Sequence, residues 1–275
     1  RVVVITGTVS VAIEDLQLTG GLIGGDGGGV YAEAAAVTIS NSQVYSNSAD
    51  GGDGGGFFST GVLTVANSSF LSNTALVDGI GDLGDGGAIS TIGNLFVTGA
   101  SIANNTADDG GGGIDNDGDY TLIRNSQITG NFAYSGGGLD IDGITEIENS
   151  DVLTNVADYG GGIDSAAPFS VTSSLIQGNI ASYEGGGLIF GDTLYMTDTQ
   201  VLSNTAVDYW GGGLTNYGAA VIMDSTFAGN EAPDGLVVSG GSVAESLTGG
   251  SVVALLSGHD PDAGDTLHYT LPLDY

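Results

Sequence analysis

Gly130-Asn131-Phe132-Ala133-Tyr134-Ser135-Gly136-Gly137-Gly138-Leu139 is the stretch of sequence that decides the fold. It consists of Asn-x-Ala, a short gap, three glycines and one aliphatic residue, and most of the chain repeats this order. The repeated asparagines are spaced by 26, 32, 26, 24, 24, 25 and 26 residues, and they are Asn47, Asn73, Asn105, Asn131, Asn155, Asn179, Asn204 and Asn230. A fixed period of this size indicates stacked repeats.

Each repeat contains short runs with β-strand character and no sustained helical periodicity. A run such as Val37-Thr38-Ile39 is followed by a small polar pair, an apolar residue three positions before the asparagine, the glycine cluster and another strand. Three short strands and three turns make one coil of a parallel β-helix, whose apolar face is buried only when coils stack. We predict an all-β protein with about nine coils of 24–26 residues over residues 1–235.

The repeated residues have structural explanations. We expect the asparagine amides to point into a turn and to bond to the backbone or to the next asparagine. The alanine two positions later is small because the chain bends there, and the glycines permit positive φ and close approach between coils. The 32-residue spacing marks an insertion at residues 76–84, which we expect to form a loop on the turn before Gly86.

The composition limits the function. The 275 residues carry a net charge of −31, with two arginines, no lysine and no cysteine. Such a chain would repel nucleic acid and has no basic patch that could release counterions. It has no apolar run long enough to span a membrane. The acidity and the missing cysteine fit a secreted or cell-surface protein, and we interpret Arg1 as an internal or processed start.

Residues 1–235 resemble parallel β-helix repeat proteins of the polymorphic outer-membrane-protein type. That family pairs Phe-x-x-Asn with Gly-Gly-Ala-Ile, as in Phe70-Leu71-Ser72-Asn73 with Gly86-Gly87-Ala88-Ile89. The resemblance implies a right-handed β-helix in a bacterial surface or secreted protein, in some cases an adhesive one. It implies little else about function.

Residues 236–275 follow a different pattern, with β-type runs and an acidic turn. Glu245, the entry Gly249-Gly250-Ser251-Val252-Val253 and the segment from Asp260 to Tyr269 resemble the first half of a bacterial cadherin-like module. The resemblance implies a short β-sandwich-like domain and calcium ligation by Glu245, Asp260 and Asp262. The later Asp-x-Asn-Asp ligands of that family do not occur here.

An acidic column follows the glycine clusters. Asp115, Asp140 and Asp164 occupy matching positions in consecutive repeats, and strand alternation places them on the outer face. Stacked carboxylates could hold calcium. They could also act as a glycosidase pair, or they could simply form the solvated face of an acidic protein. All three interpretations remain open at this point.

Aromatic residues precede the glycine clusters of four consecutive repeats: Tyr134, Tyr159, Tyr183, Tyr209 and Trp210. A stacked, partly exposed row beside carboxylates could bind sugar rings, because aromatic side chains offer apolar faces with polar tips. The alternative is that stacking only stiffens the turn.

No convergent catalytic set is visible in the repeats. Arg124 is the one interior basic residue and is expected to pair with neighbouring acids, while His259 and His268 lie in the tail. The sequence therefore favours a non-enzymatic rod, adhesin or self-assembling, filament-like subunit that is stabilised by calcium. Its expected partners are further copies, neighbouring domains or glycans, with no nucleic acid. The alternative is a β-helix that binds or degrades polysaccharide through the acidic column and the tyrosines.

Overall fold

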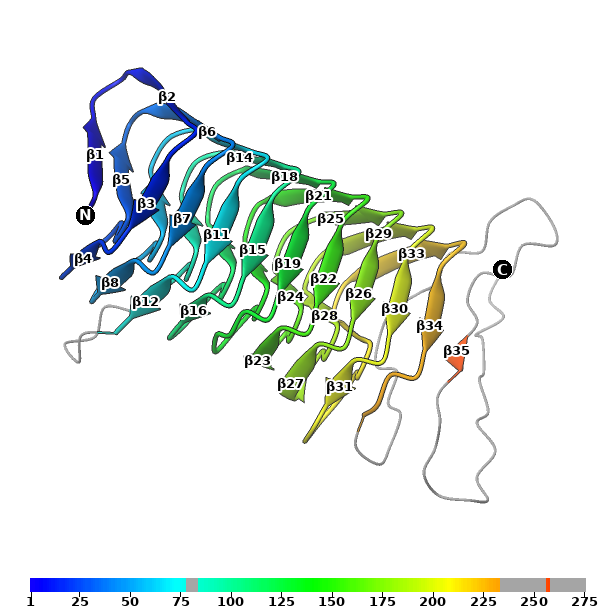
Figure 1. The fold of residues 1–275 in the computed structure, drawn as a ribbon. Coiled ribbons are helices and arrows are strands. Elements are labelled where there is room, and N and C mark those ends of the chain that lie inside the picture. The colour runs from blue at the N-terminus through cyan, green and yellow to red at the C-terminus, as the bar shows by residue number, and fades with distance from the viewer. Residues whose placement is uncertain (78–83, 233–255, 258–275) are drawn as a thin grey trace.

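The computed structural model describes residues 1–77, 84–232 and 256–257. These residues form a parallel β-helix of about eight coils and contain no helix, which confirms the predicted all-β fold (Figure 1). The coils are stacked along one rod. The first sheet contains nine strands, and the eight intervals between successive strands correspond to about eight coils.

Three parallel sheets form the long sides of the rod. The first contains β1 (Val3–Thr6), β5 (Val30–Glu33), β9 (Phe57–Ser59), β13 (Ile89–Thr91), β17 (Ile114–Asn116), β20 (Leu139–Ile141), β24 (Ile163–Ser165), β28 (Leu188–Phe190) and β32 (Leu214–Asn216). The second contains β2 (Ser10–Glu14), β6 (Ala36–Ser40), β10 (Leu63–Ala66), β14 (Leu95–Thr98), β18 (Tyr120–Arg124), β21 (Ile144–Glu148), β25 (Phe169–Thr172), β29 (Thr193–Thr197) and β33 (Ala219–Met223). The third contains β3 (Gln17–Thr19), β7 (Gln43–Tyr45), β11 (Ser69–Leu71), β15 (Ser101–Ala103), β19 (Gln127–Thr129), β22 (Asp151–Leu153), β26 (Leu175–Gln177), β30 (Gln200–Leu202), β34 (Thr226–Ala228) and β35 (Leu256–Ser257).

A fourth strand, two to five residues long, follows the repeated asparagine in most coils, where the sequence predicted only a turn. One short sheet contains β4 (Leu22–Ile23), β8 (Ser48–Asp50), β12 (Thr74–Leu76) and β16 (Thr106–Ala107), and another contains β23 (Val156–Tyr159), β27 (Ile180–Glu184) and β31 (Thr205–Ala206). Phe132 joins the two through single bridges to Thr106 and Val156. The short strands therefore continue along the rod as a narrow fourth side (Figure 1).

Equal positions of successive repeats lie next to each other. Leu139, for example, pairs with Ile114 on one side and Ile163 on the other. The inward apolar side chains therefore stack in columns and form one continuous core, with residues such as Phe57, Phe70 and Ile128 fully buried. Each such side chain contributes about 1.5–3 kcal/mol by its removal from water.

The asparagine column is a continuous buried ladder, as predicted. The side chain of Asn131 donates from Nδ2 to Oδ1 of Asn155 at 2.9 Å and to the carbonyl of Ile102 at 3.1 Å. Its Oδ1 accepts from the backbone N–H and from Nδ2 of Asn105, both at 2.9 Å. Every hydrogen-bonding position of this buried amide is used, which explains why the repeat requires asparagine.

A second polar ladder lies between the second and third sheets, and the sequence pattern alone did not indicate its role. In this serine ladder the backbone N–H of one coil donates to the hydroxyl of the next, as from Ser126 to Ser150 at 3.1 Å. That hydroxyl donates in turn to the carbonyl two residues earlier, here Glu148 at 2.8 Å. The residue before each serine turns the chain with positive φ, for example 49° at Asn125 and 48° at Asn149. Asparagine tolerates this conformation, which accounts for the Asn-Ser pairs.

Two predicted features fall largely outside the described residues. The insertion is described only at its edges, up to residue 77 and again from Gly84. The boundary at residue 235 and the cadherin-like segment also lie outside, apart from β35, which pairs in parallel with β34. In the described part of the chain there is no helix of the length and apolarity needed to cross a membrane.

Candidate functional site

The acidic column lies on the outer side of the first sheet. Asp115 pairs with Asp140 and Asp140 with Asp164 in the register of β17, β20 and β24. The prediction that these residues are aligned is therefore confirmed, but the column is not a freely solvated face. Asp115 is 9% exposed, and Asp140 and Asp164 are half-buried.

The carboxylates of this column converge with one from the glycine turn. A Cβ on Gly110 would lie 3.0 Å from Oδ2 of Asp140, 3.2 Å from Oδ1 of Asp85 and 3.4 Å from Oδ1 of Asp115. Each of three successive coils thus directs one aspartate side chain at the space beside Gly110, which has no side chain of its own. Asp164 lies one coil further on and accepts a hydrogen bond from the hydroxyl of Ser135 at 2.8 Å.

A further ladder, which was not predicted from the sequence, consists of Asp26, Asp53 and Asp85. Oδ1 of Asp26 accepts from the backbone N–H of Asp53 at 3.1 Å, and Oδ1 of Asp53 accepts from that of Asp85 at 3.0 Å. Oδ1 of Asp85 accepts from the N–H of Gly110 at 2.7 Å. Each of the three aspartates immediately precedes a glycine cluster, and this was the available signal.

Burial and mutual repulsion favour the neutral form of these acids. Burial, and then the charge of Asp164, raises the pKa of Asp140 to about 8. Burial, and then the charges of Asp85 and Asp117, raises the pKa of Asp115 well above its usual value. Burial also raises the pKa of Asp53 to about 6. The raised pKa values of Asp140 and Asp115 favour their protonated forms near neutral pH, so the column carries less than its full formal charge there.

No group of three or more acidic or histidine side chains in residues 1–77 and 84–232 has an arrangement that could hold a metal ion. The acidic column is therefore not supported as a cation site. The predicted calcium ligands Glu245, Asp260 and Asp262 lie outside the described residues, as do His259 and His268. Their roles remain predictions from the resemblance.

The tyrosine stripe, defined as Tyr134, Tyr159, Tyr183 and Tyr209, is a continuous row of contacting rings along the rod. Successive ring centroids lie 5.6, 5.1 and 5.6 Å apart, with interplanar angles of 68°, 39° and 42°. The two end rings are the most exposed, at 47% for Tyr134 and 54% for Tyr209. Trp210 follows Tyr209 and is also exposed.

Apolar and acidic residues lie close to the stripe in sequence. Phe132 and Ile180 are exposed on the fourth side, two positions before Tyr134 and three before Tyr183, respectively. Acidic residues adjoin three of the four rings in sequence: Asp158, Glu184 and Asp208. The hydroxyl of Tyr217 donates to the carboxylate of Glu184. Burial, followed by this bond, raises the pKa of Tyr217 to about 12.

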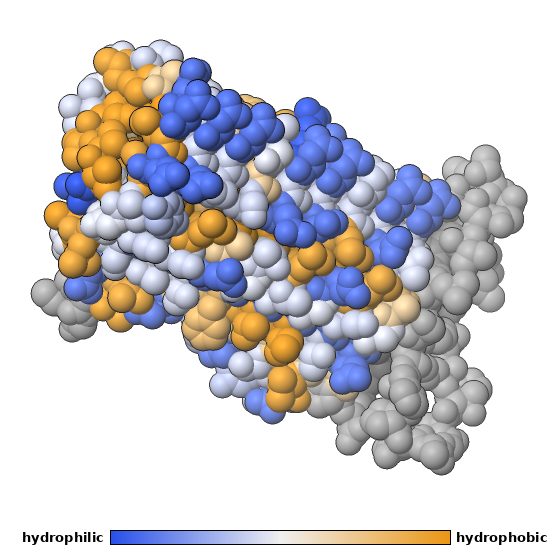
Figure 2. Space-filling view, viewed as in Figure 1, coloured by the Kyte–Doolittle hydropathy of each residue, from blue (hydrophilic) through white to orange (hydrophobic). Residues whose placement is uncertain are grey.

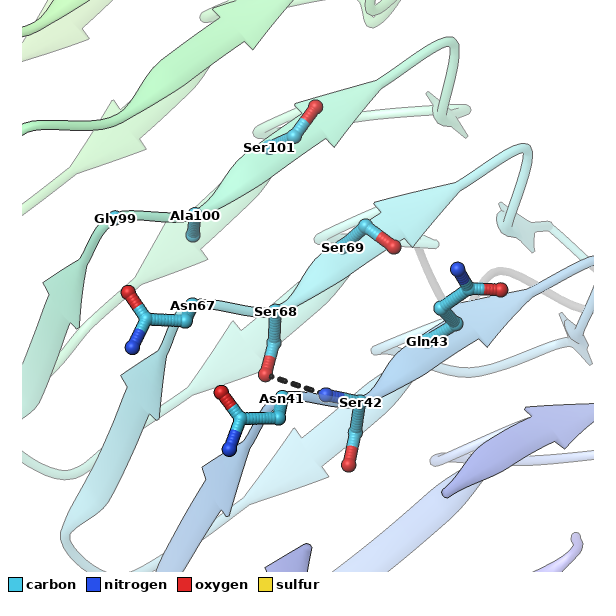
Figure 3. Close-up of a pocket in the computed structure, with 9 residues that line it drawn as sticks. All are labelled: Asn41, Ser42, Gln43, Asn67, Ser68, Ser69, Gly99, Ala100 and Ser101. Atoms are coloured by element: carbon cyan, nitrogen blue, oxygen red, sulfur yellow. Dashed lines mark hydrogen bonds between the residues drawn. The ribbon is translucent and has the colours of Figure 1, made fainter. Parts of the chain in front are cut away.

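A shallow depression of about 320 Å³ lies elsewhere, between the second and third sheets (Figure 3). It spans three coils at Asn41, Asn67 and Gly99 and contains the serine-ladder bond from the backbone of Ser42 to the hydroxyl of Ser68. Gly99-Ala100 replace the usual Asn-Ser pair there, so the asparagine side chain and the serine hydroxyl are missing. The lining is small and polar and contains no titratable group, so it cannot supply acid–base catalysis.

Arg124 pairs with Glu148, as expected. Its Nε and Nη2 donate to the two carboxylate oxygens at 2.8 and 3.1 Å. The guanidinium is thus engaged in a two-pronged ion pair on the surface of the second sheet, on strands β18 and β21. It is not directed at the acidic column.

Comparisons with family models, with curated proteins and with solved structures gave no match. The β-helical architecture is therefore established by the structure itself. The repeat type and the cadherin-like module are supported only by the residues quoted for the two resemblances.

Proposed function

We propose that the chain is a non-enzymatic β-helical rod of a secreted or cell-surface protein, which acts as a structural element and binds partners along its side. One contrast in the structure supports this proposal. The carboxyl groups that could do chemistry are buried or half-buried and accept hydrogen bonds from the glycine turn and from Ser135, whereas the aromatic groups that could bind a partner are aligned and partly exposed.

The ladders support the structural part of the proposal. Buried asparagines bond from coil to coil between Asn47 and Asn230, so each coil is fixed in register with the next. Such a rod presents the same surface position every roughly 4.8 Å, which suits attachment to extended or repetitive partners. Self-association and contact with neighbouring domains belong to the same proposal, as does stabilisation by calcium through the tail.

The second candidate is binding or cleavage of polysaccharide, and the raised pKa of Asp140 favours it. A carboxyl that stays protonated near neutral pH is the form that a glycosidase needs as general acid. Cleavage also needs a second, ionised carboxylate and access for the sugar. At Asp140 the neighbouring acids have raised pKa values as well, and they are packed against the glycine turn.

An assay of released reducing ends distinguishes the two functions. The chain would be incubated with a panel of neutral and acidic polysaccharides, beside the variant Asp140→Asn and the control Asp142→Asn, which alters an exposed acid of the same coil. We expect no release by any of the three proteins. Release that Asp140→Asn abolishes and Asp142→Asn retains would establish an enzyme.

A further inference from the structure

A guanidinium already rests on an aromatic ring at the first coil. Cζ of Arg1 lies 4.6 Å from the ring centroid of Tyr31, and Tyr31 stacks on Phe58 at 5.6 Å with 15° between the planes. Nε of Arg1 also donates to the carbonyl of Asp26 at 2.9 Å. Stacked rings with an oxygen acceptor beside them thus bind a guanidinium in this molecule.

The chain has few cations of its own for its other acidic and aromatic groups. Arg1 and Arg124 are its only arginines, it has no lysine, and its net charge is −31. Arg1 lies on Tyr31, and Arg124 is paired with Glu148. A cation that reaches the other rings and carboxylates must therefore come largely from outside these 275 residues.

The tyrosine stripe also combines aromatic rings with oxygen acceptors, and it does so over a longer distance. Its four rings are in contact and partly exposed, and Asp158, Glu184 and Asp208 adjoin three of them in the chain. On the face drawn in Figure 2, hydrophilic residues likewise form rows that follow the length of the rod. A partner with positive charges at regular intervals would match such a surface.

We propose that the tyrosine stripe binds an extended, arginine-rich segment of a partner protein, laid along the rod with guanidinium groups over the rings and paired with Asp158, Glu184 and Asp208. This rests on the proposed function, since it names the partner of the binding rod. Three coil steps of roughly 4.8 Å span about 14 Å, which matches about four residues of extended chain. Arginine fits better than lysine because its planar guanidinium stacks on aromatic rings and can also form a bidentate ion pair with a carboxylate.

The geometry of the rings favours a guanidinium over a neutral sugar. Adjacent rings are inclined by 39° to 68°, so the stripe is not a flat platform on which successive sugar rings could lie. A guanidinium needs only one ring face and one acceptor, as Arg1 demonstrates. The acidic neighbours add charge complementarity that a neutral glycan would not use.

The test measures binding of labelled tetra-arginine, tetra-lysine and a neutral cello-oligosaccharide to the full chain at roughly 150 mM salt, where loose charge attraction is screened. The variant Tyr159→Leu/Tyr183→Leu removes the two central rings. The matched control is Tyr195→Leu, an exposed tyrosine on β29 of the second sheet. Tyr159→Phe/Tyr183→Phe keeps the rings, and Glu184→Gln removes one charge. Each variant is first shown to unfold at the midpoint of the parent chain.

We expect tetra-arginine to bind more tightly than tetra-lysine. The double leucine variant should lose about tenfold in affinity, since one exposed ring contributes roughly two- to fivefold. The phenylalanine variant and Tyr195→Leu should bind like the parent chain, and Glu184→Gln should bind more weakly. Equal losses in the double leucine variant and Tyr195→Leu would overturn the proposal, as would oligosaccharide binding that only the double leucine variant loses. Neither result bears on catalysis, which the reducing-end assay decides separately.

Discussion

Replacement of Asn131 by leucine isolates the contribution of the asparagine ladder. Leucine is similar in size but can neither donate nor accept a hydrogen bond. It would strand the backbone N–H of Asn105 and one hydrogen of its Nδ2, while the other hydrogen keeps its bond to the carbonyl of Phe70. The carbonyl of Ile102 would also lose its donor. Each buried polar group left unpaired costs about 1–3 kcal/mol, so we expect a loss of about 4 kcal/mol.

Urea unfolding of Asn131→Leu beside Gln127→Leu measures this loss. Gln127 is an exposed residue of β19 in the same coil, so its replacement should change the free energy of unfolding by less than about 0.5 kcal/mol. The urea midpoints of two variants can be compared where the slopes of their unfolding transitions agree, because a stack of coils need not unfold as one unit. Hydrogen exchange should also show faster exchange of the Asn105 amide. Equal midpoints for the two variants would refute the reasoning.

Three further predictions follow from the acidic column, the glycine turns and the tail. The free energy of unfolding should fall as pH rises from about 4 to about 8, because Asp140 keeps its proton in the folded chain up to about pH 8 and loses it near pH 4 when unfolded. The variant Asp140→Asn should flatten this fall. If the fall is unchanged in the variant, Asp140 is not the group responsible for it. Gly138→Ala should destabilise the rod by about 1–3 kcal/mol, because its Cβ would lie 2.6 Å from the carbonyl oxygen of Gly162; Gly24→Ala is the control, since its Cβ would meet nothing nearer than 3.7 Å, and equal midpoints would argue against close coil contact. Calcium should raise the thermal midpoint and a chelator should reverse the rise, and Asp260→Asn/Asp262→Asn should abolish both effects; an unchanged midpoint would remove calcium from the account.

The sequence predicted the rod well because its repeats encode contacts between neighbours. A residue such as Leu139 or Asn131 meets its own counterpart one period away, so the spacing alone gives the register. The short strands of the fourth side could not be foreseen in the same way. Six of these seven strands have the repeated alanine at their buried position, and alanine is depleted in strands, so they lack the large apolar residues that marked the other strands.

The candidate sites were predicted less completely. The sequence placed Asp115, Asp140 and Asp164 in one column but did not show that Asp85 reaches them over the gap at Gly110. The approach of Asp85 to the column depends on the path of the glycine turn, and glycines have no side chains from which that path could be predicted. The burial of these aspartates could not be inferred either, because strand alternation predicts which face of the sheet a side chain lies on but not what covers that face. The tyrosine contacts were predictable, since four tyrosines precede consecutive glycine clusters.

In the proposed rod, the asparagine ladder holds the coils together and the tyrosine stripe binds the partner. The most direct test of this division is one comparison of Asn131→Leu with Tyr134→Ala, in which the unfolding midpoint and the binding of tetra-arginine and a glycan panel are measured on the same samples. We predict that Asn131→Leu lowers the midpoint and, below it, binds like the parent chain, whereas Tyr134→Ala unfolds like the parent chain and binds more weakly. If Tyr134→Ala lowers the midpoint and leaves all binding unchanged, the stripe serves only to stiffen the turn and this division is wrong.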